Sequence, residues 1–274
     1  MTNLRDTALT FRALHTSTAP LALANVWDAA GARLVAEAGA PAVATTSAGV
    51  AWGLGAADGD RLGRARALEL IARVVAAVDV PVTADIESGF GADPDGVAET
   101  IRGVLAAGAV GVNLEDASHG GSTPLRPVAE QSERIAAARA AAGDVPLFIN
   151  ARVDTYLRGV GDPADRLRTT LDRAAAYLAA GADGVFVPGV TDPTTVAALA
   201  EALTAPLNVL VGPGAPSVAE LGKLGVARVS LGSAVAEAAY AVVRRAAREL
   251  YESGTYTGLT DTIPYGDLNA LFAR

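Results

Sequence analysis

The chain has 274 residues, 51% of them hydrophobic, and its 30 aspartates and glutamates outnumber its 22 lysines and arginines, which gives a net charge of −8. This length allows one large domain or two small ones with a sizeable core. An acidic chain without a basic run argues against a surface for nucleic acid or anionic membranes, and the lack of cysteine excludes disulfides, thiolate metal sites and a cysteine nucleophile.

The apolar stretches are short and are interrupted by Gly, Asp or Arg. The first residues, MTNLRDTALTFRALH, lack the apolar core of a signal peptide. We therefore expect a soluble cytoplasmic protein that neither spans a membrane nor binds nucleic acid, and whose partner is a small molecule.

Short apolar runs that end in polar residues alternate with alanine-rich segments of helical period, and this alternation continues along the chain without a linker. A leading helix is expected over residues 1–16, with His15 in a structural role. Eight strands are expected after it, at residues 21–27, 41–47, 80–87, 111–116, 147–154, 184–189, 206–212 and 228–232. A long final helix at 233–252 and a tail at 253–274 complete a single predicted domain, residues 1–274.

The starts of these strands fall into two alternating types. Odd-numbered strands begin with proline, where a missing N–H group is tolerated, at Pro20, Pro81, Pro146 and Pro206. Even-numbered strands follow a glycine placed to end a helix, at Gly39, Gly108, Gly181 and Gly225. Such alternation over eight βα units is typical of an α/β protein of the (β/α)8 (TIM) barrel type. The rival, a doubly wound open sheet, would usually have a glycine-rich phosphate-binding turn after its first strand, and NVWDAAGAR does not provide one.

Aspartates mark several predicted helix starts. Asp93, Asp162 and Asp192 each precede a proline, which indicates an N-cap followed by proline at the first helical position. Asp28, after the first strand, is most simply an N-cap as well. At the other end of the chain, the tail carries apolar residues at roughly helical spacing, which indicates that it docks on its own barrel or on a neighbouring subunit: Ile263, Leu268, Leu271 and Phe272.

Polar residues stand at the carboxyl ends of the predicted strands, where a barrel gathers them at one mouth. They are Ser47, Asp85, Glu87, Glu115, Asp116, Asn150, Arg152 and Asn208. Several carboxylates around one mouth repel each other unless a positive charge lies among them. Oxygen ligands suit a hard cation, Mg²⁺ or Mn²⁺, bound partly through water.

The pair Asp85 and Glu87 is the strongest local signal in PVTADIESGFG. Their i, i+2 spacing would place both carboxylates on one face of an extended strand. Asp116 follows Glu115 and would point the other way, so a helix N-cap or a solvated loop residue remains an equal alternative for it. Asp58, in the polar loop GLGAADGD, is a turn residue on local evidence.

Three further features leave alternatives open. Arg152, inside an apolar strand, must pair either with the carboxylate cluster or with an anionic ligand, and we favour the ligand. Ser47-Ala48-Gly49 could offer consecutive N–H groups to an anion, or be an ordinary turn. His119, in the loop EDASHGGSTPLRP, is either a proton donor on a lid or, as we favour, a solvated loop histidine.

Taken together, NVWDAAGARLVAEAGAPAVATTSAGVAWGLGAAD, PVTADIESGFG, GVNLEDA, INARVD and GADGVFVPG resemble the isocitrate lyase/phosphoenolpyruvate mutase superfamily, over about residues 20–235. The tail IPYGDLNALF is similar to the ends of its short, single-domain members. The resemblance implies a (β/α)8 barrel whose last helix is exchanged with a neighbour, in a homotetramer built as a dimer of dimers.

The resemblance also implies roles for individual residues. It implies Mg²⁺ bound at Asp85, with Glu87 and Glu115 holding the ion through water; the family usually has aspartate at the position of Glu87. Asp58 matches an active-site aspartate. Five further positions match residues that contact the substrate. The N–H groups of Ser47, Ala48 and Gly49 receive a substrate carboxylate, Arg152 grips the substrate, and Asn208 contacts it.

The family's shared chemistry is the making or breaking of a bond next to a 2-oxo acid. The lid segment 117–127 departs from the family pattern, because SHGGSTPLRP has none of the Cys, Lys or Asn residues found there in known members. A conventional isocitrate lyase is therefore disfavoured, and His119 is the candidate proton donor. We expect a Mg²⁺-dependent lyase or decarboxylase of a small 2-oxo or 2-hydroxy di- or tricarboxylate. The alternatives are a phosphoenolpyruvate/phosphonopyruvate mutase or hydrolase, and a weakly active or non-catalytic protein that binds 2-oxo acids.

Overall fold

The computed structural model describes residues 3–273. Its strands are β1 (Leu21–Leu23), β2 (Asn25–Val26), β3 (Val43–Thr45), β4 (Val82–Asp85), β5 (Gly111–Glu115), β6 (Phe148–Arg152), β7 (Gly184–Val187), β8 (Leu207–Leu210) and β9 (Arg228–Ser230). Its helices are α1 (Leu4–Leu14), α2 (Ala29–Glu37), α3 (Ser47–Gly53), α4 (Arg64–Ala77), α5 (Pro94–Ala107), α6 (Val128–Ala141), α7 (Arg166–Ala179), α8 (Pro193–Ala202), α9 (Val218–Lys223), α10 (Ala234–Ser253) and α11 (Tyr265–Ala270).

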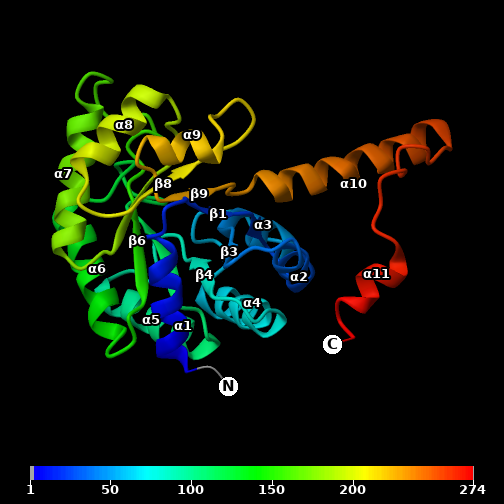
Figure 1. Cartoon of the computed structure of the whole chain (residues 1–274), viewed down its shortest axis with the longest axis horizontal. Helices are drawn as coiled ribbons and strands as arrows, with labels where there is room; N and C mark the ends of the chain where they lie inside the picture. The colour runs from blue at the N-terminus through cyan, green and yellow to red at the C-terminus, as the bar shows by residue number, and fades with distance from the viewer. Residues whose placement is uncertain (1–2, 274) are drawn as a thin grey trace.

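The strands form one parallel sheet that curls into a barrel, with helices around its outside (Figure 1). The sheet order is β1-β9-β8-β7-β6-β5-β4-β3-β2. The first predicted strand, 21–27, is split at Ala24: β1 pairs with the last strand, β9, and β2 pairs with β3. The two halves of one strand thus close the ring. The predicted (β/α)8 barrel is confirmed, with all eight predicted strands present.

The helix starts follow the predicted caps with one exception. The side chains of Asp28, Asp93 and Asp192 each accept a hydrogen bond from the backbone N–H three residues later. Asp162 instead accepts from the N–H of Ala164, within a turn, and α7 begins only at Arg166. The start predicted at Asp162 was therefore too early.

Helix α1 closes the amino-terminal end of the barrel with an apolar cluster that includes Phe11 and Phe148. His15 stacks on Phe148 with ring centroids 3.8 Å apart, and its Nδ1 lies 3.0 Å from the carbonyl oxygen of Phe11. Burial, assisted by Arg228, lowers the pKa of His15 to about 3, so the imidazole is neutral. The structural role predicted for His15 is confirmed; of the predicted helix 1–16, residues 1–2 lie outside the described part of the chain.

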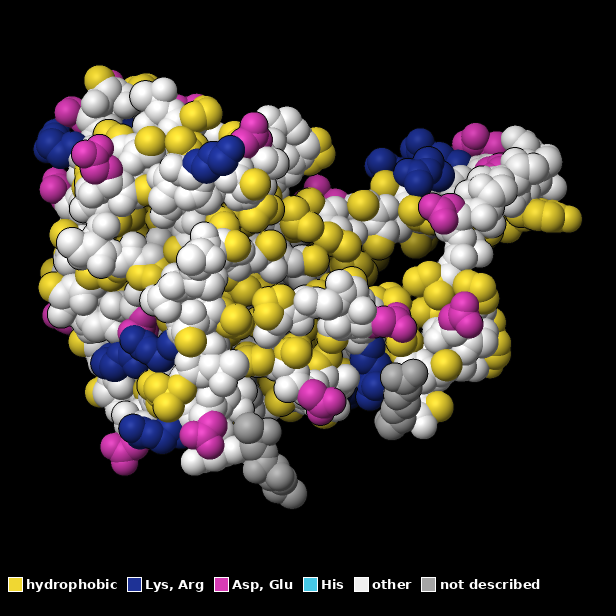
Figure 2. All heavy atoms as spheres, in the orientation of Figure 1, with side chains coloured by type: hydrophobic (Ala, Val, Ile, Leu, Met, Phe, Trp, Pro, Cys, Tyr) yellow, Lys and Arg dark blue, Asp and Glu magenta, His cyan; other side chains and the backbone are white. Residues whose placement is uncertain are grey.

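Helix α10 leaves the barrel as an arm, and α11 at its end turns back toward α2 (Figures 1 and 2). A guanidinium nitrogen of Arg33, in α2, donates to the carbonyl oxygen of Leu271 over 2.5 Å. The same guanidinium lies 5.1 Å from the centre of the Phe272 ring. The tail therefore docks on its own barrel. Across residues 3–273, none of the helices has both the length and the apolar character needed to cross a bilayer.

Candidate active site

A cavity of about 200 Å³ lies at the mouth formed by the carboxyl ends of the strands. Its polar lining comes from strand ends and the loops that follow them, and includes Ser47, Asp58, Asp85, Asn113, Arg152 and Ser230. The strand-end arrangement expected of a barrel is therefore present.

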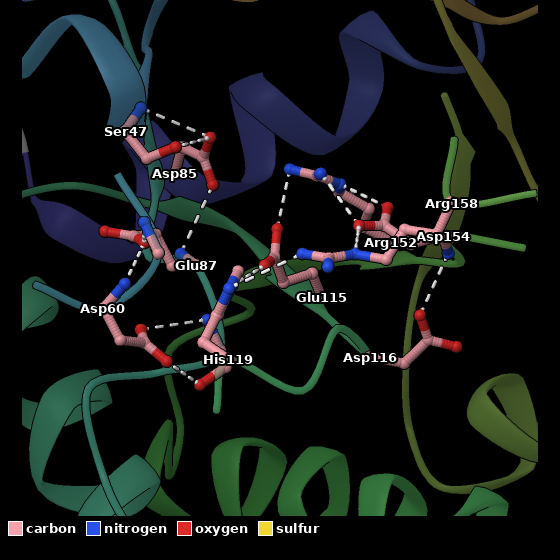
Figure 3. A network of polar contacts seen from close by, with 12 residues as sticks. Ser47, Asp60, Asp85, Glu87, Glu115, Asp116, His119, Arg152, Asp154 and Arg158 are labelled. Atoms are coloured by element: carbon pink, nitrogen blue, oxygen red, sulfur yellow. Dashed lines mark hydrogen bonds and ion pairs between the residues drawn. The ribbon is translucent and has the colours of Figure 1, made fainter. Parts of the chain in front are cut away.

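Asp85 ends β4, and its carboxylate faces the start of α3 (Figure 3). Oδ2 of Asp85 accepts from the hydroxyl of Ser47 at 2.9 Å and from the backbone N–H of Ser47 at 3.3 Å. The segment Ser47–Gly49 is thus the first turn of a helix rather than an isolated turn. Ala48 lines the cavity. Gly49 lies behind it, where a Cβ would come within 2.8 Å of the Thr46 side chain.

Glu87 does not share a strand face with Asp85, so that part of the sequence prediction was wrong. The strand ends at Asp85, and Glu87 has a left-handed backbone with φ of 51°. The Glu87 carboxylate accepts from the backbone N–H groups of Gly59, at 2.7 Å, and Asp60, so it holds the loop after α3. Burial and nearby carboxylates raise the pKa of Glu87 to about 8, although the bond from Asp60 opposes this.

Arg152 is enclosed by two carboxylates in this structure. Its Nη1 lies 2.7 Å from Glu115, and its Nε and Nη2 bind both oxygens of Asp154 at 2.6 and 2.9 Å. Pairing with carboxylates, the less favoured sequence alternative, is therefore the arrangement observed. Burial raises the pKa of Glu115, while the positive charge of Arg152 opposes the shift.

His119 is not a freely solvated loop residue, contrary to the reading that the sequence favoured. Its Nε2 lies 2.5 Å from Oε1 of Glu115, and its side chain is 20% exposed. The hydrogen bond to Glu115 raises the pKa of His119. The lid segment folds back on itself through an antiparallel bridge between Ala117 and Leu125. His119 belongs to the rim of the mouth and is not among the residues that line the cavity.

Asp116 and Asn208 lie away from the cavity lining. Asp116 is fully buried and accepts hydrogen bonds from Arg173, at 3.0 Å, and from Tyr177, at 2.9 Å. It is thus neither an N-cap nor a solvated loop residue, but a structural carboxylate. Asn208 is buried in the barrel interior, where its Oδ1 lies 3.3 Å from the hydroxyl of Ser230.

Asp58 lines the cavity, and burial together with the carboxylate of Asp85 raises its pKa. Three residues of the network were missed by sequence reasoning: Asp60, Ser88 and Asp154. Asp60 accepts from the hydroxyl of Ser88, and Asp154 orients Arg152. The i, i+2 spacing in INARVD could have indicated Asp154, whereas no sequence signal set Asp60 apart from its polar loop.

The oxygen atoms around Asp85 that could act as metal ligands fit a hard cation bound largely through water. They are carboxylate and hydroxyl oxygens, which Mg²⁺ and Mn²⁺ prefer. Within residues 3–273, no three acidic or histidine side chains converge closely enough to hold an ion together. A cation here would therefore take few direct protein ligands, which agrees with the tendency of Mg²⁺ to keep several waters.

Comparison with known proteins gives consistent matches along the chain. A family model described as phosphoenolpyruvate phosphomutase matches residues 11–251. An uncharacterized protein of Mycobacterium tuberculosis strain H37Rv is 37% identical over 263 residues, which are 96% of this chain and 95% of that protein. The 2-methylisocitrate lyase of Escherichia coli K12 is 29% identical over 273 residues, which are 95% of this chain and 90% of that enzyme.

Among solved structures, a Burkholderia cenocepacia J2315 protein described as of the lyase/mutase type superposes with a TM-score of 0.91 at 44% identity. The match covers 99% of this chain and 97% of that one. Other matching proteins are named oxaloacetate decarboxylase, phosphoenolpyruvate phosphomutase and 2,3-dimethylmalate lyase.

Proposed function

The chain belongs to the phosphoenolpyruvate phosphomutase family of the isocitrate lyase/phosphoenolpyruvate mutase superfamily, whose members are enzymes, and from this we propose that it is a Mg²⁺-dependent carbon–carbon lyase or decarboxylase. Its substrate is a small 2-oxo or 2-hydroxy di- or tricarboxylate, cleaved next to the oxo or hydroxy carbon through an enolate-like intermediate. The observation that carries this proposal is that Asp58, Asp85 and Arg152 line one cavity of about 200 Å³. That size suits an acid of a few carbons.

We assign substrate binding to two groups of residues beside Asp85, the first turn of α3 and Arg152. The first turn of α3, Ser47 to Gly49, receives one carboxylate through its N–H groups, and Arg152 grips a second in place of one of its present carboxylate partners. Asn208 lies in the barrel interior, outside the cavity lining, and we assign it a further contact with the substrate. Its side-chain NH₂ group is buried and has no hydrogen-bond partner among residues 3–273, so a donor is available there.

Asp85 would hold the metal directly, and Glu87 and Glu115 would hold it through water. Mg²⁺, or Mn²⁺ in its place, would supply a Lewis acid where negative charge develops next to the oxo carbon. Asp58 takes the proton from the substrate hydroxyl, because it lines the cavity and its raised pKa brings it closer to neutral pH. The Glu115–His119 pair holds, at the rim, the proton that is returned to the leaving carbon.

The test is a screen of oxaloacetate, 2-methylisocitrate, isocitrate, substituted malates and phosphonopyruvate with Mg²⁺, following the 2-oxo acid formed. We expect turnover of at least one carbon–carbon substrate, lost on addition of EDTA. Calorimetry with Mn²⁺ provides the matched measurement: Asp85→Asn should lose metal binding, whereas Asp58→Asn should keep metal binding and lose turnover. Turnover of phosphonopyruvate alone would reassign the chemistry to carbon–phosphorus bonds. Tight binding of a 2-oxo acid without any turnover would make the protein a binder.

A further inference from the structure

A buried arginine lies inside the barrel, below the cavity that opens at the mouth, and no carboxylate is bonded to it. Arg228 begins β9 and is 1% exposed. Its Nη2 lies 3.3 Å from Oδ1 of Asn113, whereas its Nε and Nη1 have no hydrogen-bond partner among residues 3–273. Arg139 shows the usual arrangement of a structural arginine, because its guanidinium nitrogens bind two carbonyl oxygens and the carboxylate of Asp183. An apolar side chain of similar volume is often at least as stable in place of a buried charge, so stability does not account for Arg228.

One side chain, that of Asn113, connects Arg228 to the cavity. Asn113 accepts the hydrogen bond from Arg228 and also lines the cavity. Ser230, two residues later on the same strand and therefore on the same face, lines it as well. Burial lowers the pKa of Arg228 to about 9, and the carboxylate of Asp85 opposes this shift. The guanidinium is thus charged at neutral pH, and its charge acts on Asp85 in the cavity wall.

The charged groups around the cavity are otherwise mostly acidic. Asp58 and Asp85 line it, and the lining arginine, Arg152, is paired with both Glu115 and Asp154. These carboxylates attract a metal ion and repel a substrate carboxylate. A positive charge below the cavity has the opposite effect on each ligand, since it attracts the anion and repels the cation. Because the guanidinium is buried, water and salt screen its charge only weakly.

We propose that Arg228 is an electrostatic positioning residue, whose charge strengthens the binding of a carboxylate ligand in the cavity and weakens the binding of the metal ion. It acts through its electric field and through Asn113, without contact with either ligand. The inference rests on the proposed function in one respect, because it takes the cavity as the site of both a small carboxylate and a divalent cation. It does not depend on which bond is cleaved.

The test measures two dissociation constants by calorimetry, that of Mn²⁺ with metal-free protein and that of oxalate with Mg²⁺-saturated protein. Arg228→Met removes the charge and leaves an unbranched apolar side chain in its place. We expect this variant to bind Mn²⁺ about tenfold more tightly and oxalate about tenfold more weakly, which is the order of magnitude for one charge acting across a partly polar interior. Opposite shifts identify an effect of charge, because a distorted site would bind both ligands more weakly.

Two further variants separate charge from structure. Arg228→Gln keeps a donor for Asn113 but has no charge, and it should shift both constants in the same directions as Arg228→Met. Arg102→Met removes a positive charge from the exposed side of α5 and should shift neither constant.

Weaker binding of both ligands by the two Arg228 variants, or no change in either constant, would overturn the inference. Failure of both variants to fold would assign Arg228 to stability and would overturn it as well. Neither measurement requires turnover, so a protein that binds Mn²⁺ and oxalate but converts no substrate would disprove the lyase function alone. A wild type that binds neither ligand would overturn both proposals.

Discussion

His119 is the side chain of the lid segment, residues 117–127, to which we assign proton transfer, and this segment contains no Cys, Lys or Asn. We expect His119→Ala to lower kcat by about 100-fold or more with little change in KM, which is the usual contribution of a general acid. The pKa of His119 is raised by its hydrogen bond to Glu115, so the imidazole stays protonated to higher pH than a free histidine. Activity that depends on this acid should therefore persist above pH 6.5 and fall as pH rises through the raised pKa.

The measurement is a pH profile of kcat for wild type and for His119→Ala. Ser122→Ala, an exposed position in the same segment, serves as the matched control and should leave the profile unchanged. Wild-type kcat in His119→Ala, within about twofold, would show that the segment is only a cover.

Individual site residues were predictable where they end a strand, and less so in loops. Asp85 and Arg152 were found because a polar side chain inside an apolar run is conspicuous, and the strand periodicity aims it at the mouth. Glu87 was misplaced because a φ of 51° breaks that periodicity. Asp60 also has a positive φ, of 60°, and the direction of its side chain is set by Ser88 and not by any local repeat.

The loop after α3 depends on Glu87, because two of its backbone N–H groups, at Gly59 and Asp60, bind that carboxylate. The pKa of Glu87 is raised from 4.5 to about 8, so between these pH values the folded protein binds more protons than the unfolded chain. Its contribution to the free energy of unfolding therefore decreases as pH rises from 4.5 to 8. Glu87→Gln removes this dependence while keeping an acceptor oxygen for the loop.

We expect metal-free Glu87→Gln to melt several degrees above metal-free wild type at pH 8.5, since roughly 2–4 °C corresponds to 1 kcal/mol in a chain of this size. Near pH 4.5 the two should melt at similar temperatures. The measurement is thermal unfolding in EDTA across this pH range, with the exposed Glu201→Gln as control. A Glu87→Gln protein that melts below wild type at every pH would show that the charged carboxylate is needed to hold the loop.

The helices and strands that were predictable are those whose starts are marked by a particular residue type. Proline at odd strands and glycine before even strands located all eight, and aspartate caps located α2, α5 and α8. The split at Ala24 was not predictable, because it arises from closing the ring and not from the local sequence. Helix α3 was missed because SAGVAWG has two glycines and no capping side chain.

Helix α10 leaves one flank of the barrel uncovered. An apolar groove of about 430 Å³ lies there, bounded by residues such as Val35, Val218 and Val229. In a (β/α)8 barrel this flank is where the eighth helix should pack. Helix α10 projects away instead, and hydrophobic side chains gather on the barrel beside the start of the arm (Figures 1 and 2). The arm itself exposes Tyr240, Val243 and Leu250, which lie along one face of the helix.

The apolar groove of one copy and the exposed apolar face of α10 of another copy complement each other. In the described part of a single chain, no helix covers the groove and the face of α10 packs against no groove. We therefore expect the protein to form an oligomer in which α10 of one copy packs on the barrel of another. Val243, 63% exposed in the single chain, should be covered in that assembly. Val243→Glu should then dissociate the oligomer and lower the melting temperature, as measured by light scattering and thermal unfolding, because a carboxylate would be buried without a partner. Arg245→Glu, on the opposite face of the helix, should leave both unchanged. A wild-type protein that is monomeric in solution would contradict the expectation and leave α10 without a binding surface. In that case Val243→Glu would change the free energy of unfolding by no more than about 0.5 kcal/mol, as is usual for an exposed position.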